Sequence, residues 1–264
     1  MQIQRVESET VVPKGEDGKT IDYIKQGDCL ELMKEIPSGS VDMILCDLPY
    51  GATHNSWDKR IDLTKLWLEY KRIIKDNGAI CLFGQGRFFA DLIDSNRAWY
   101  RYDYVWDKVL TTGFLNANRI PLHRHEQIGV FYKKLPTYNP QFFNGKPLHG
   151  RGTGYLKKET VNHNYGSFNN MTDERKGTTE KFPTTILSFP KAHPSKSIHP
   201  TEKPISLLEF LIKTYTNKGD VVLDNAMGCG NTIIACINTE RHYIGYEIER
   251  KYYELAKERI EKGG

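Results

Sequence analysis

The chain has 264 residues, of which 39% are hydrophobic and 27% charged, and its formal net charge is +4. This length allows one full hydrophobic core with an inserted subdomain, since single cores stop growing near roughly 250 to 300 residues. The sequence contains no apolar run of about 18 residues and no apolar segment at its start, which argues against a membrane protein or an exported one, and we expect a cytoplasmic protein.

The positive charge is concentrated in one part of the chain. Between Lys133 and Lys203 there are twelve Lys and Arg residues against five Asp and Glu, a net charge of +7, so the remainder sums to −3. A basic, irregular stretch fits a polyanionic partner, because Lys and Arg displace counterions from phosphates. A solvated basic surface without a partner remains an alternative. The five cysteines form no C-x-x-C pair and no zinc spacing, which predicts reduced, buried thiols and no metal site.

Helical and strand patterns alternate along the first half of the chain, after a polar arm at residues 1–20. The expected elements are a strand at 23–28, a helix at 29–36 ended by Pro37, a buried strand at 41–46, a helix from Leu63 to Ile74 capped by Asp62, a strand at 79–83, a helix at 87–94, and strands at 100–108 and 126–132. This alternation predicts an α/β protein with a mostly parallel sheet covered on both faces.

Periodicity fails from Lys134 to Ile198 and returns near His199. Such a long stretch without a pattern is typical of a functional insertion. The elements expected after it are a helix that Thr201 would cap, a strand at 220–224, a helix at 232–238, a strand at 243–247 and a last helix ending near Ile260. The domains are therefore predicted as the arm 1–20, a first half 21–133, a basic insertion 134–198 and a second half 199–264.

The first candidate site is the corner Asp47-Leu48-Pro49-Tyr50, which follows the strand at 41–46. Open α/β sheets bind ligands at the carboxyl ends of their strands, and this corner would present a carboxylate and an aromatic ring there. An alternative is that Asp47 only caps the next segment and Tyr50 packs in the core. The neighbouring Cys46 would point to the opposite side of the strand and is interpreted as core.

The second candidate site combines the glycine-rich turn after the strand at 220–224 with Glu247. A strand, a glycine-rich turn, a helix and a second strand ending in an acid are typical of nucleoside-binding βαβ units. Asp224 would repel a phosphate but suits a cationic ligand such as S-adenosylmethionine, and Glu247 can accept both ribose hydroxyls. Asp28, at the end of a third strand, could bond the adenine amino group or cap a helix. The sequence contains no phosphate-binding G-x-x-x-x-G-K-[ST] motif, which argues against phosphoryl transfer.

These blocks together resemble the S-adenosylmethionine-dependent DNA amino-methyltransferases, in the permuted group whose catalytic half comes first. Asp47 to Tyr50 is similar to the family's Asp-Pro-Pro-Tyr motif with Leu48 in place of proline, and residues 199–204 are similar to its His-Pro-Thr-Gln-Lys-Pro motif with Glu202 for Gln. The turn after Asp224 departs from the usual Asp-Pro-Phe-x-Gly-Ser-Gly-Thr-Thr. The resemblance implies a Rossmann-like methyltransferase fold with a seven-stranded sheet, and a target-recognition region at 134–198.

The resemblance also implies residue roles. The catalytic residues would be Asp47, Leu48, Pro49 and Tyr50. The residues that bind S-adenosyl-L-methionine would be Asp28, Cys29, Asp47, His199, Pro200, Thr201, Lys203, Asp224, Ala226, Met227, Gly228, Gly230, Asn231, Thr232, Glu247 and Ile248. The expected substrate is double-stranded DNA, which Lys157, Lys158 and Arg124 would contact; a homodimer is open, and no metal is required.

In the implied reaction, Asp47 and a backbone carbonyl of Leu48 or Pro49 accept the hydrogens of an exocyclic amine on a flipped base, and Tyr50 stacks on that base. Cytosine C5 transfer is disfavoured because it needs a thiolate, usually in a Pro-Cys pair, which the chain lacks. Asp47 favours adenine N6, since cytosine-N4 enzymes more often have Ser there. Open alternatives are cytosine N4, an RNA or protein amino-methyltransferase, and an inactive DNA-binding regulator. His123, Arg124, His125 and Glu126 could touch substrate or form only a polar turn.

Overall fold

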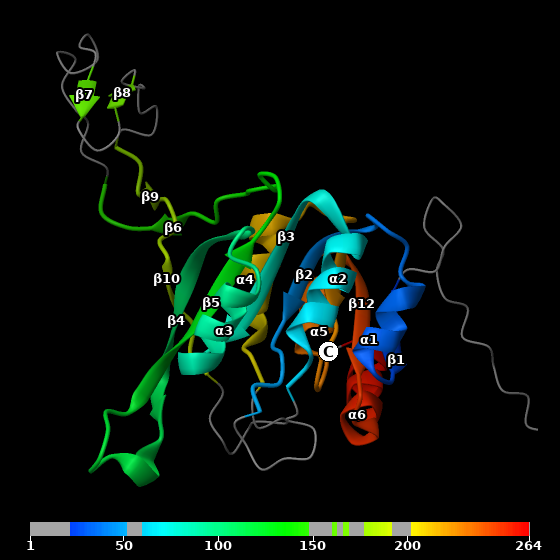
Figure 1. Ribbon diagram of the computed structural model, residues 1–264. Helices are drawn as coiled ribbons and strands as arrows, with labels where there is room; N and C mark the ends of the chain where they lie inside the picture. Colours follow the sequence, from blue (N-terminus) through cyan, green and yellow to red (C-terminus); the bar gives the residue numbers. More distant parts are fainter. Residues whose placement is uncertain are drawn as a thin grey trace, which may run out of the picture. The chain divides into compact units, whose positions relative to one another are not determined.

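The computed structural model describes residues 22–51, 60–147, 160–162, 166–168, 177–191 and 202–263. The chain divides into two compact units. The larger unit comprises the described residues up to Asn139 and from Thr185 onward, and it contains the main sheet and its helices (Figure 1). The smaller unit lies within Pro140–Thr184.

The larger unit is built on one eight-stranded sheet with the order β1-β12-β11-β2-β3-β5-β4-β10. The strands are β1 (Tyr23–Gln26), β2 (Val41–Cys46), β3 (Ile74–Gly84), β4 (Tyr100–Thr112), β5 (His123–Phe131), β10 (Ile186–Ser188), β11 (Val221–Asp224) and β12 (His242–Glu247). All neighbouring strands are parallel except for the pairs of β5 with β3 and β4, which confirms the predicted mostly parallel sheet.

The expected number of seven strands is wrong by one. The eighth strand, β10, has three residues and pairs with the edge of β4. It falls in the stretch where the sequence shows no periodicity, and a strand this short is too brief for an alternating pattern to be recognised.

Strands β2 and β11 are far apart in the sequence but adjacent in the sheet. Met43 pairs with Val222 and Ile44 with Leu223. From this pair, β11 leads outward to β12 on one side and β2 leads outward to β3 on the other. The order of the strands therefore reverses between β2 and β11, and α/β sheets bind ligands at the carboxyl ends of strands at such a point.

Helices cover both faces of the sheet (Figure 1). They are α1 (Cys29–Leu32), α2 (Leu63–Ile73), α3 (Gly86–Ser95), α4 (Ile205–Tyr215), α5 (Asn231–Asn238) and α6 (Arg250–Glu261), with the 3-10 turns η1 (Met33–Glu35) and η2 (Phe114–Asn116). Asp62 caps α2 as predicted, since its carboxylate accepts the backbone N–H groups of Thr64 and Lys65. The cap predicted at Thr201, which lies outside the described residues, is wrong: α4 begins at Ile205 with Pro204 at its N-cap.

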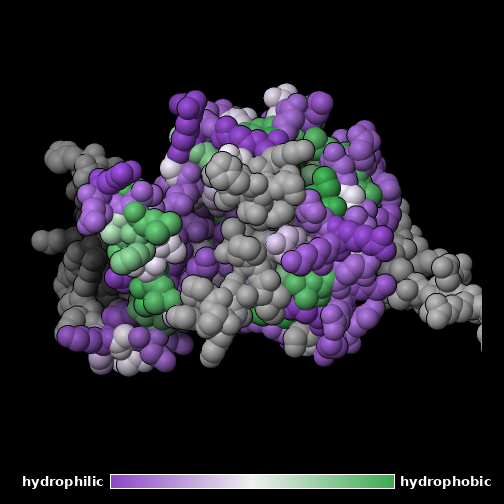
Figure 2. Space-filling model, turned by 90° about the horizontal axis from the view of Figure 1, so that it is seen from below, coloured by the Kyte–Doolittle hydropathy of each residue, from purple (hydrophilic) through white to green (hydrophobic). Residues whose placement is uncertain are grey.

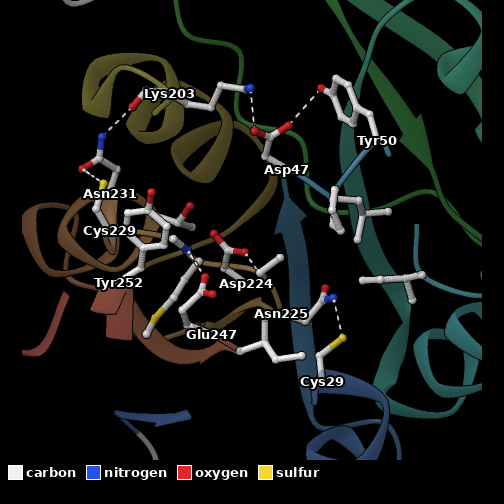
Figure 3. A pocket seen from close by; sticks show the side chains of 18 of the residues that line it. Cys29, Asp47, Tyr50, Lys203, Asp224, Asn225, Cys229, Asn231, Glu247 and Tyr252 are labelled. Carbon is white, nitrogen blue, oxygen red and sulfur yellow. Dashed lines mark hydrogen bonds and ion pairs between the residues drawn. The ribbon is translucent and has the colours of Figure 1, made fainter. Parts of the chain in front are cut away.

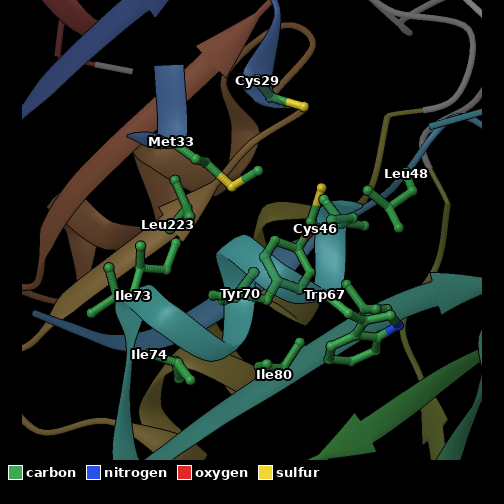
Figure 4. Packing of buried hydrophobic residues seen from close by; sticks show 14 of the residues in the cluster. Cys29, Met33, Cys46, Leu48, Trp67, Tyr70, Ile73, Ile74, Ile80 and Leu223 are labelled. Atoms are coloured by element: carbon green, nitrogen blue, oxygen red, sulfur yellow. The ribbon is translucent and has the colours of Figure 1, made fainter. Parts of the chain in front are cut away.

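Side-chain alternation along β2 distributes the core to both faces of the sheet. Ile44 and Cys46 pack on the face covered by α1, α2 and α3, where Figure 4 shows Tyr70 of α2 directed toward Cys46. Met43 and Leu45 pack on the other face with α4 and α5. Because both faces are covered, the strand is apolar at almost every position, as the sequence indicated.

The smaller unit contains two short antiparallel ladders. They are β6 (Phe143–Asn144) with β9 (Glu180–Lys181), and β7 (Thr160–Asn162) with β8 (Gly166–Phe168). The rings of Phe142 and Phe182 lie 5.0 Å apart between centroids. In the described parts of the chain, no helix combines the length and the apolar character needed to span a membrane.

Candidate active site

A pocket of about 740 Å³ lies at the carboxyl ends of β2, β11 and β12 (Figure 3). Asp47 follows β2, Asp224 ends β11 and Glu247 ends β12, and all three line this pocket. The two halves of the chain thus contribute to the same cavity.

The corner after β2 is held by contacts on both sides of its polar end. The Tyr50 hydroxyl donates a hydrogen bond to Oδ1 of Asp47 at 2.9 Å, and its ring stacks on Phe88 with centroids 4.6 Å apart. Leu48 is buried in the core beside α2. Pro49 restricts the backbone between these anchors. Asp47 is therefore fixed by its neighbours and faces the pocket.

Lys203 lies between two carboxylates, one that follows β2 and one within β5. Its Nζ is 2.6 Å from Oδ2 of Asp47 and 3.1 Å from Oε2 of Glu126, and Glu126 is also 3.2 Å from Nζ of Lys108. The ammonium of Lys203 further lies over the rings of Phe83 and Trp106. The result is a buried row of alternating charges, Lys108, Glu126, Lys203 and Asp47.

Burial and pairing shift the pKa values in this row in different directions. Burial raises the pKa of Asp47, and the neighbouring Glu126 raises it further, while Lys203 opposes both. Burial alone would lower the pKa of Lys203, but the two carboxylates raise it to about 12. Burial acts to raise the pKa of Glu126 as well, yet Lys203 and Lys108 bring it below its ordinary value. Lys203 therefore carries a permanent positive charge beside Asp47.

The turn after β11 presents a second carboxylate to the pocket. Asp224 accepts the backbone N–H of Ala226 at 3.1 Å, and burial raises its pKa to about 6. Gly228 and Gly230 have φ values of 54° and 83°, which favour glycine. The side chain of Asn231, the first residue of α5, donates to the backbone oxygen of Lys203 at 2.8 Å. This bond joins the turn to the segment that positions Lys203.

Glu247 is bound by backbone N–H groups on both of its oxygens. Oε2 accepts from Gly228 at 2.9 Å and Oε1 from Glu249 at 2.8 Å. The residue is 7% exposed, and burial raises its pKa. In the described part of the chain, neither Glu247 nor Asp224 forms an ion pair, so the pocket has two buried carboxylates that a cationic or hydroxyl-bearing ligand could engage.

Asp28 both caps a helix and lines the pocket. Its Oδ1 accepts the backbone N–H of Leu30 at 2.8 Å, so the alternative reading as a helix cap is correct, and its side chain also borders the cavity. Next to it, Cys29 lies 3.5 Å from the amide nitrogen of Asn225, and burial raises the pKa of the Cys29 thiol to about 11. This thiol is inert packing rather than a nucleophile.

The structure brings most of the predicted site residues together. Those that line the pocket are Asp28, Cys29, Asp47, Leu48, Pro49, Tyr50, Lys203, Asp224, Ala226, Met227, Gly228, Asn231, Thr232, Glu247 and Ile248. Gly230 is not among them: it caps α5, and a side chain there would meet Ala256 at 3.0 Å. Arg124 lies away from the pocket in an ion pair with Asp107. Five predicted residues lie outside the described part of the chain: His199, Pro200, Thr201, Lys157 and Lys158.

Several lining residues were not predicted. Four further side chains border the pocket: Gln85, Trp106, Lys191 and Tyr252. Glu126, for which a polar turn was one of the expected readings, is the ion-pair partner of Lys203. Glu126 carried one signal, a charged residue at the start of an apolar strand. The other four residues belong to segments that reach the pocket only because of the order of the strands in the sheet, which the sequence did not reveal.

Comparison with known proteins places this geometry in a family. The chain matches the N6/N4 family model described as DNA methylase over residues 41–258. It is 29% identical to the type II methyltransferase M.HinfI of Haemophilus influenzae over 91% of this chain and 68% of that protein. It is also 28% identical to the DNA adenine methyltransferase YhdJ of Escherichia coli, over 94% of this chain and 84% of that protein.

Solved structures agree with this relationship. The M1.HpyAVI complex with SAM has a TM-score of 0.60 and 25% identity, covering 90% of this chain and 98% of that one. The cytosine-N4-specific PvuII DNA methyltransferase has a TM-score of 0.65 over 91% of this chain and 86% of its own, at 14% identity, and shares the fold. The chain belongs to the N6/N4 DNA methylase family and is a DNA amino-methyltransferase.

Proposed function

We propose that this protein transfers a methyl group from S-adenosylmethionine to the N6 amine of a flipped adenine in double-stranded DNA. The observation that carries the proposal is Asp47: a fixed carboxylate, paired with Lys203 at 2.6 Å, in the same pocket as the carboxylates of Asp224 and Glu247. The exocyclic amine and the methyl donor would meet in that pocket.

The residues present fit S-adenosylmethionine. The cofactor carries an ammonium and a sulfonium but no phosphate, and when bound it supplies an electrophilic methyl group on positively charged sulfur. The half of the pocket formed by Asp224 and Glu247 offers carboxylates without ion-pair partners in the described chain. The volume of the whole pocket, about 740 Å³, falls in the usual range for small-molecule sites. Glu247 would hold the ribose hydroxyls, Asp224 the positive end, and Asp28 the adenine amino group.

Asp47 would act on the substrate amine as a hydrogen-bond acceptor. The amine lone pair is delocalised into the ring, so an acceptor for its hydrogens favours a nucleophilic nitrogen. Lys203 supports this role because its positive charge opposes the effect of burial and favours the ionised form of Asp47. A backbone carbonyl of Leu48 or Pro49 would accept the second hydrogen, at a position that the proline ring restricts.

Tyr50 would stack on the flipped base. Phe88 already covers one face of its ring, and its hydroxyl is bonded to Asp47, so the ring is held before any base arrives. A fixed aromatic surface loses little conformational freedom on binding and returns part of the cost of extruding a base.

Adenine is favoured over cytosine by two observations. Asp occupies position 47, where the resemblance associates cytosine-N4 enzymes with Ser, and a relative with 28% identity over most of both chains is a DNA adenine methyltransferase. The two amines present the same local chemistry, so the product has to be identified directly.

The test is transfer of labelled methyl from S-adenosylmethionine to DNA from a methylation-free host, followed by digestion to nucleosides. We expect N6-methyl-2′-deoxyadenosine; N4-methyl-2′-deoxycytidine would overturn the base assignment. RNA and protein acceptors should remain unlabelled. Asp47→Ala should abolish transfer and retain cofactor binding by calorimetry, whereas the exposed-site control Asp94→Ala should retain both transfer and cofactor binding. Full activity of Asp47→Ala would remove Asp47 from the mechanism.

A further inference from the structure

Strands β4 and β5 continue past the active site into a hairpin arm, residues 109–125, whose residues are all exposed. At the base of this hairpin arm, Trp106 pairs with Glu126, and both line the pocket. Gln85, another lining residue, lies 3.4 Å from Nδ1 of His123 and donates to the backbone oxygen of His125 at 3.3 Å. The hairpin arm therefore starts at the wall of the active site.

A bulge on β4 shapes the base of the hairpin arm. Asp107 pairs with His125 but the next pair is Thr112 with His123, so β4 has three more residues than β5 in this interval. Val109 adopts φ 63°, which is unusual for a β-branched residue, and its N–H is bound by Asp107 at 2.9 Å. Arg124 binds the same carboxylate through two nitrogens. Bulges redirect strands, and this one is fixed by two sets of bonds.

The tip of the hairpin arm is apolar and unburied. Phe114 is 81% exposed and Leu115 is 98% exposed, with Ile120 and Leu122 nearby in sequence at 47% and 37%. Figure 2 shows hydrophobic surface gathered on the left of the view, where the hairpin arm reaches the viewer. Contiguous exposed apolar side chains mark an interaction surface.

The charge of the hairpin arm identifies the kind of partner. Residues 109–125 contain Arg119 and Arg124 and no Asp or Glu. Arg124 is paired with Asp107 at the base of the hairpin arm, so the surface charge that remains is that of Arg119, which forms no ion pair in the described part of the chain. A polyanion is attracted to such a surface. A second copy of this chain, placed tip to tip in a two-fold dimer, would bring like charges together. The position next to the pocket also agrees with DNA, since Trp106 and Glu126 at the base of the hairpin arm line the cavity that a flipped base would occupy.

We propose that the hairpin arm enters the major groove of the duplex and contacts bases beside the flipped one. This proposal rests on the proposed function. A two-stranded ribbon fits the major groove, which is about 8.5 Å deep, and β5 extends about 10 Å between Glu126 and His123. Phe114 and Leu115 contact base edges and thymine methyl groups, and the exposed amides of Asn116 and Asn118 can pair with adenine. The hairpin arm would thus be a base-contacting element outside the stretch 134–198, where the resemblance implies target recognition.

The test compares the double variant Phe114→Ala/Leu115→Ala with Leu68→Ala, which removes an exposed apolar side chain from α2. We expect the double variant to raise the Kd for a labelled random-sequence duplex, and the KM for host DNA, about tenfold or more, and Leu68→Ala to change neither. Calorimetry with S-adenosylmethionine should give wild-type affinity for both, since the tip does not line the pocket.

A second variant, Phe114→Trp, reports contact directly. The tryptophan fluorescence of this variant minus that of the wild type gives the emission of the new side chain. This emission should be quenched when the duplex is added. Wild-type duplex affinity of the double variant, or no quenching in Phe114→Trp, would overturn the inference. Loss of a wild-type dimer in the double variant, measured by sedimentation, would also overturn it and assign the tip to self-association. If the wild-type protein itself transfers no methyl to DNA, the proposed function fails instead.

Discussion

Replacing Lys203 by methionine removes the ammonium that lies between Asp47 and Glu126. Methionine keeps most of the apolar part of the side chain, and a thioether is compatible with the neighbouring rings of Phe83 and Trp106. What changes is the charge: Asp47 loses a partner at 2.6 Å and Glu126 loses one at 3.1 Å. Lys108 still pairs with Glu126, whereas Asp47 loses its one ion-pair partner in the described part of the chain and keeps the like charge of Glu126 nearby.

The expected cost is large because the site is buried. The side chains of Lys203, Glu126 and Asp47 are 8%, 14% and 22% exposed. Removing one partner from a buried pair destabilises a protein by about 3–5 kcal/mol, which compares with a total stability of about 5–15 kcal/mol. The pKa of Asp47 should also rise, because burial and Glu126 still raise it while Lys203 no longer opposes them.

The pH dependence follows from that shift. A carboxyl whose pKa is higher in the folded than in the unfolded state binds protons preferentially in the folded state, so its unfavourable contribution shrinks as the pH falls. Urea unfolding of the wild type, Lys203→Met and the surface control Lys213→Met should show a deficit only in Lys203→Met, larger at about pH 8 than at about pH 5.5. Wild-type stability of Lys203→Met at the higher pH, or a deficit that does not vary with pH, would refute the reasoning.

Two further predictions concern the cofactor half of the pocket. Burial raises the pKa of Asp224 to about 6, so this carboxyl is neutral below that pH and charged above it. The affinity for S-adenosylmethionine, measured by calorimetry, should therefore fall as the pH is lowered through 6. An affinity of the wild type that does not change with pH would contradict the role of Asp224. Gly245→Ala would place a methyl group 2.5 Å from the sulfur of Met227 and 2.9 Å from Ile233. We expect the free energy of unfolding in urea to fall by about 1–3 kcal/mol and cofactor binding to weaken. Unchanged values of both would show that the turn containing Met227 can move to make room.

The central elements of the fold were predictable because local pattern and tertiary environment agree. The run at 41–46 is apolar at almost every position because both faces of β2 are covered, and Asp62 is followed by a regular amphipathic helix. β5 begins at His123 rather than near residue 126, since its first residues belong to an exposed ladder in which no alternation of apolar and polar residues marks the strand.

The site was predictable in composition but not in its pairings. The corner at Asp47 and the turn after Asp224 each follow a recognisable strand, so sequence reasoning could place both at one edge of the sheet. The link from Lys203 to Glu126 joins residues from elements that meet only through the strand order. No local pattern records such a contact, so the ion pairs of Lys203 with Asp47 and Glu126 were not predicted from the sequence.

The adjacency of β2 and β11 has a consequence for biosynthesis. The β2 edge that pairs with Val222 and Leu223 has no partner until the ribosome has made everything from Asp47 to Asp220. At about 5–20 residues per second, this delay is on the order of ten seconds. During it, an apolar strand edge is available to other nascent chains. A lower growth temperature or a holdase chaperone should therefore increase the yield of folded protein. We expect this increase to exceed the one obtained by mutations that stabilise the folded state.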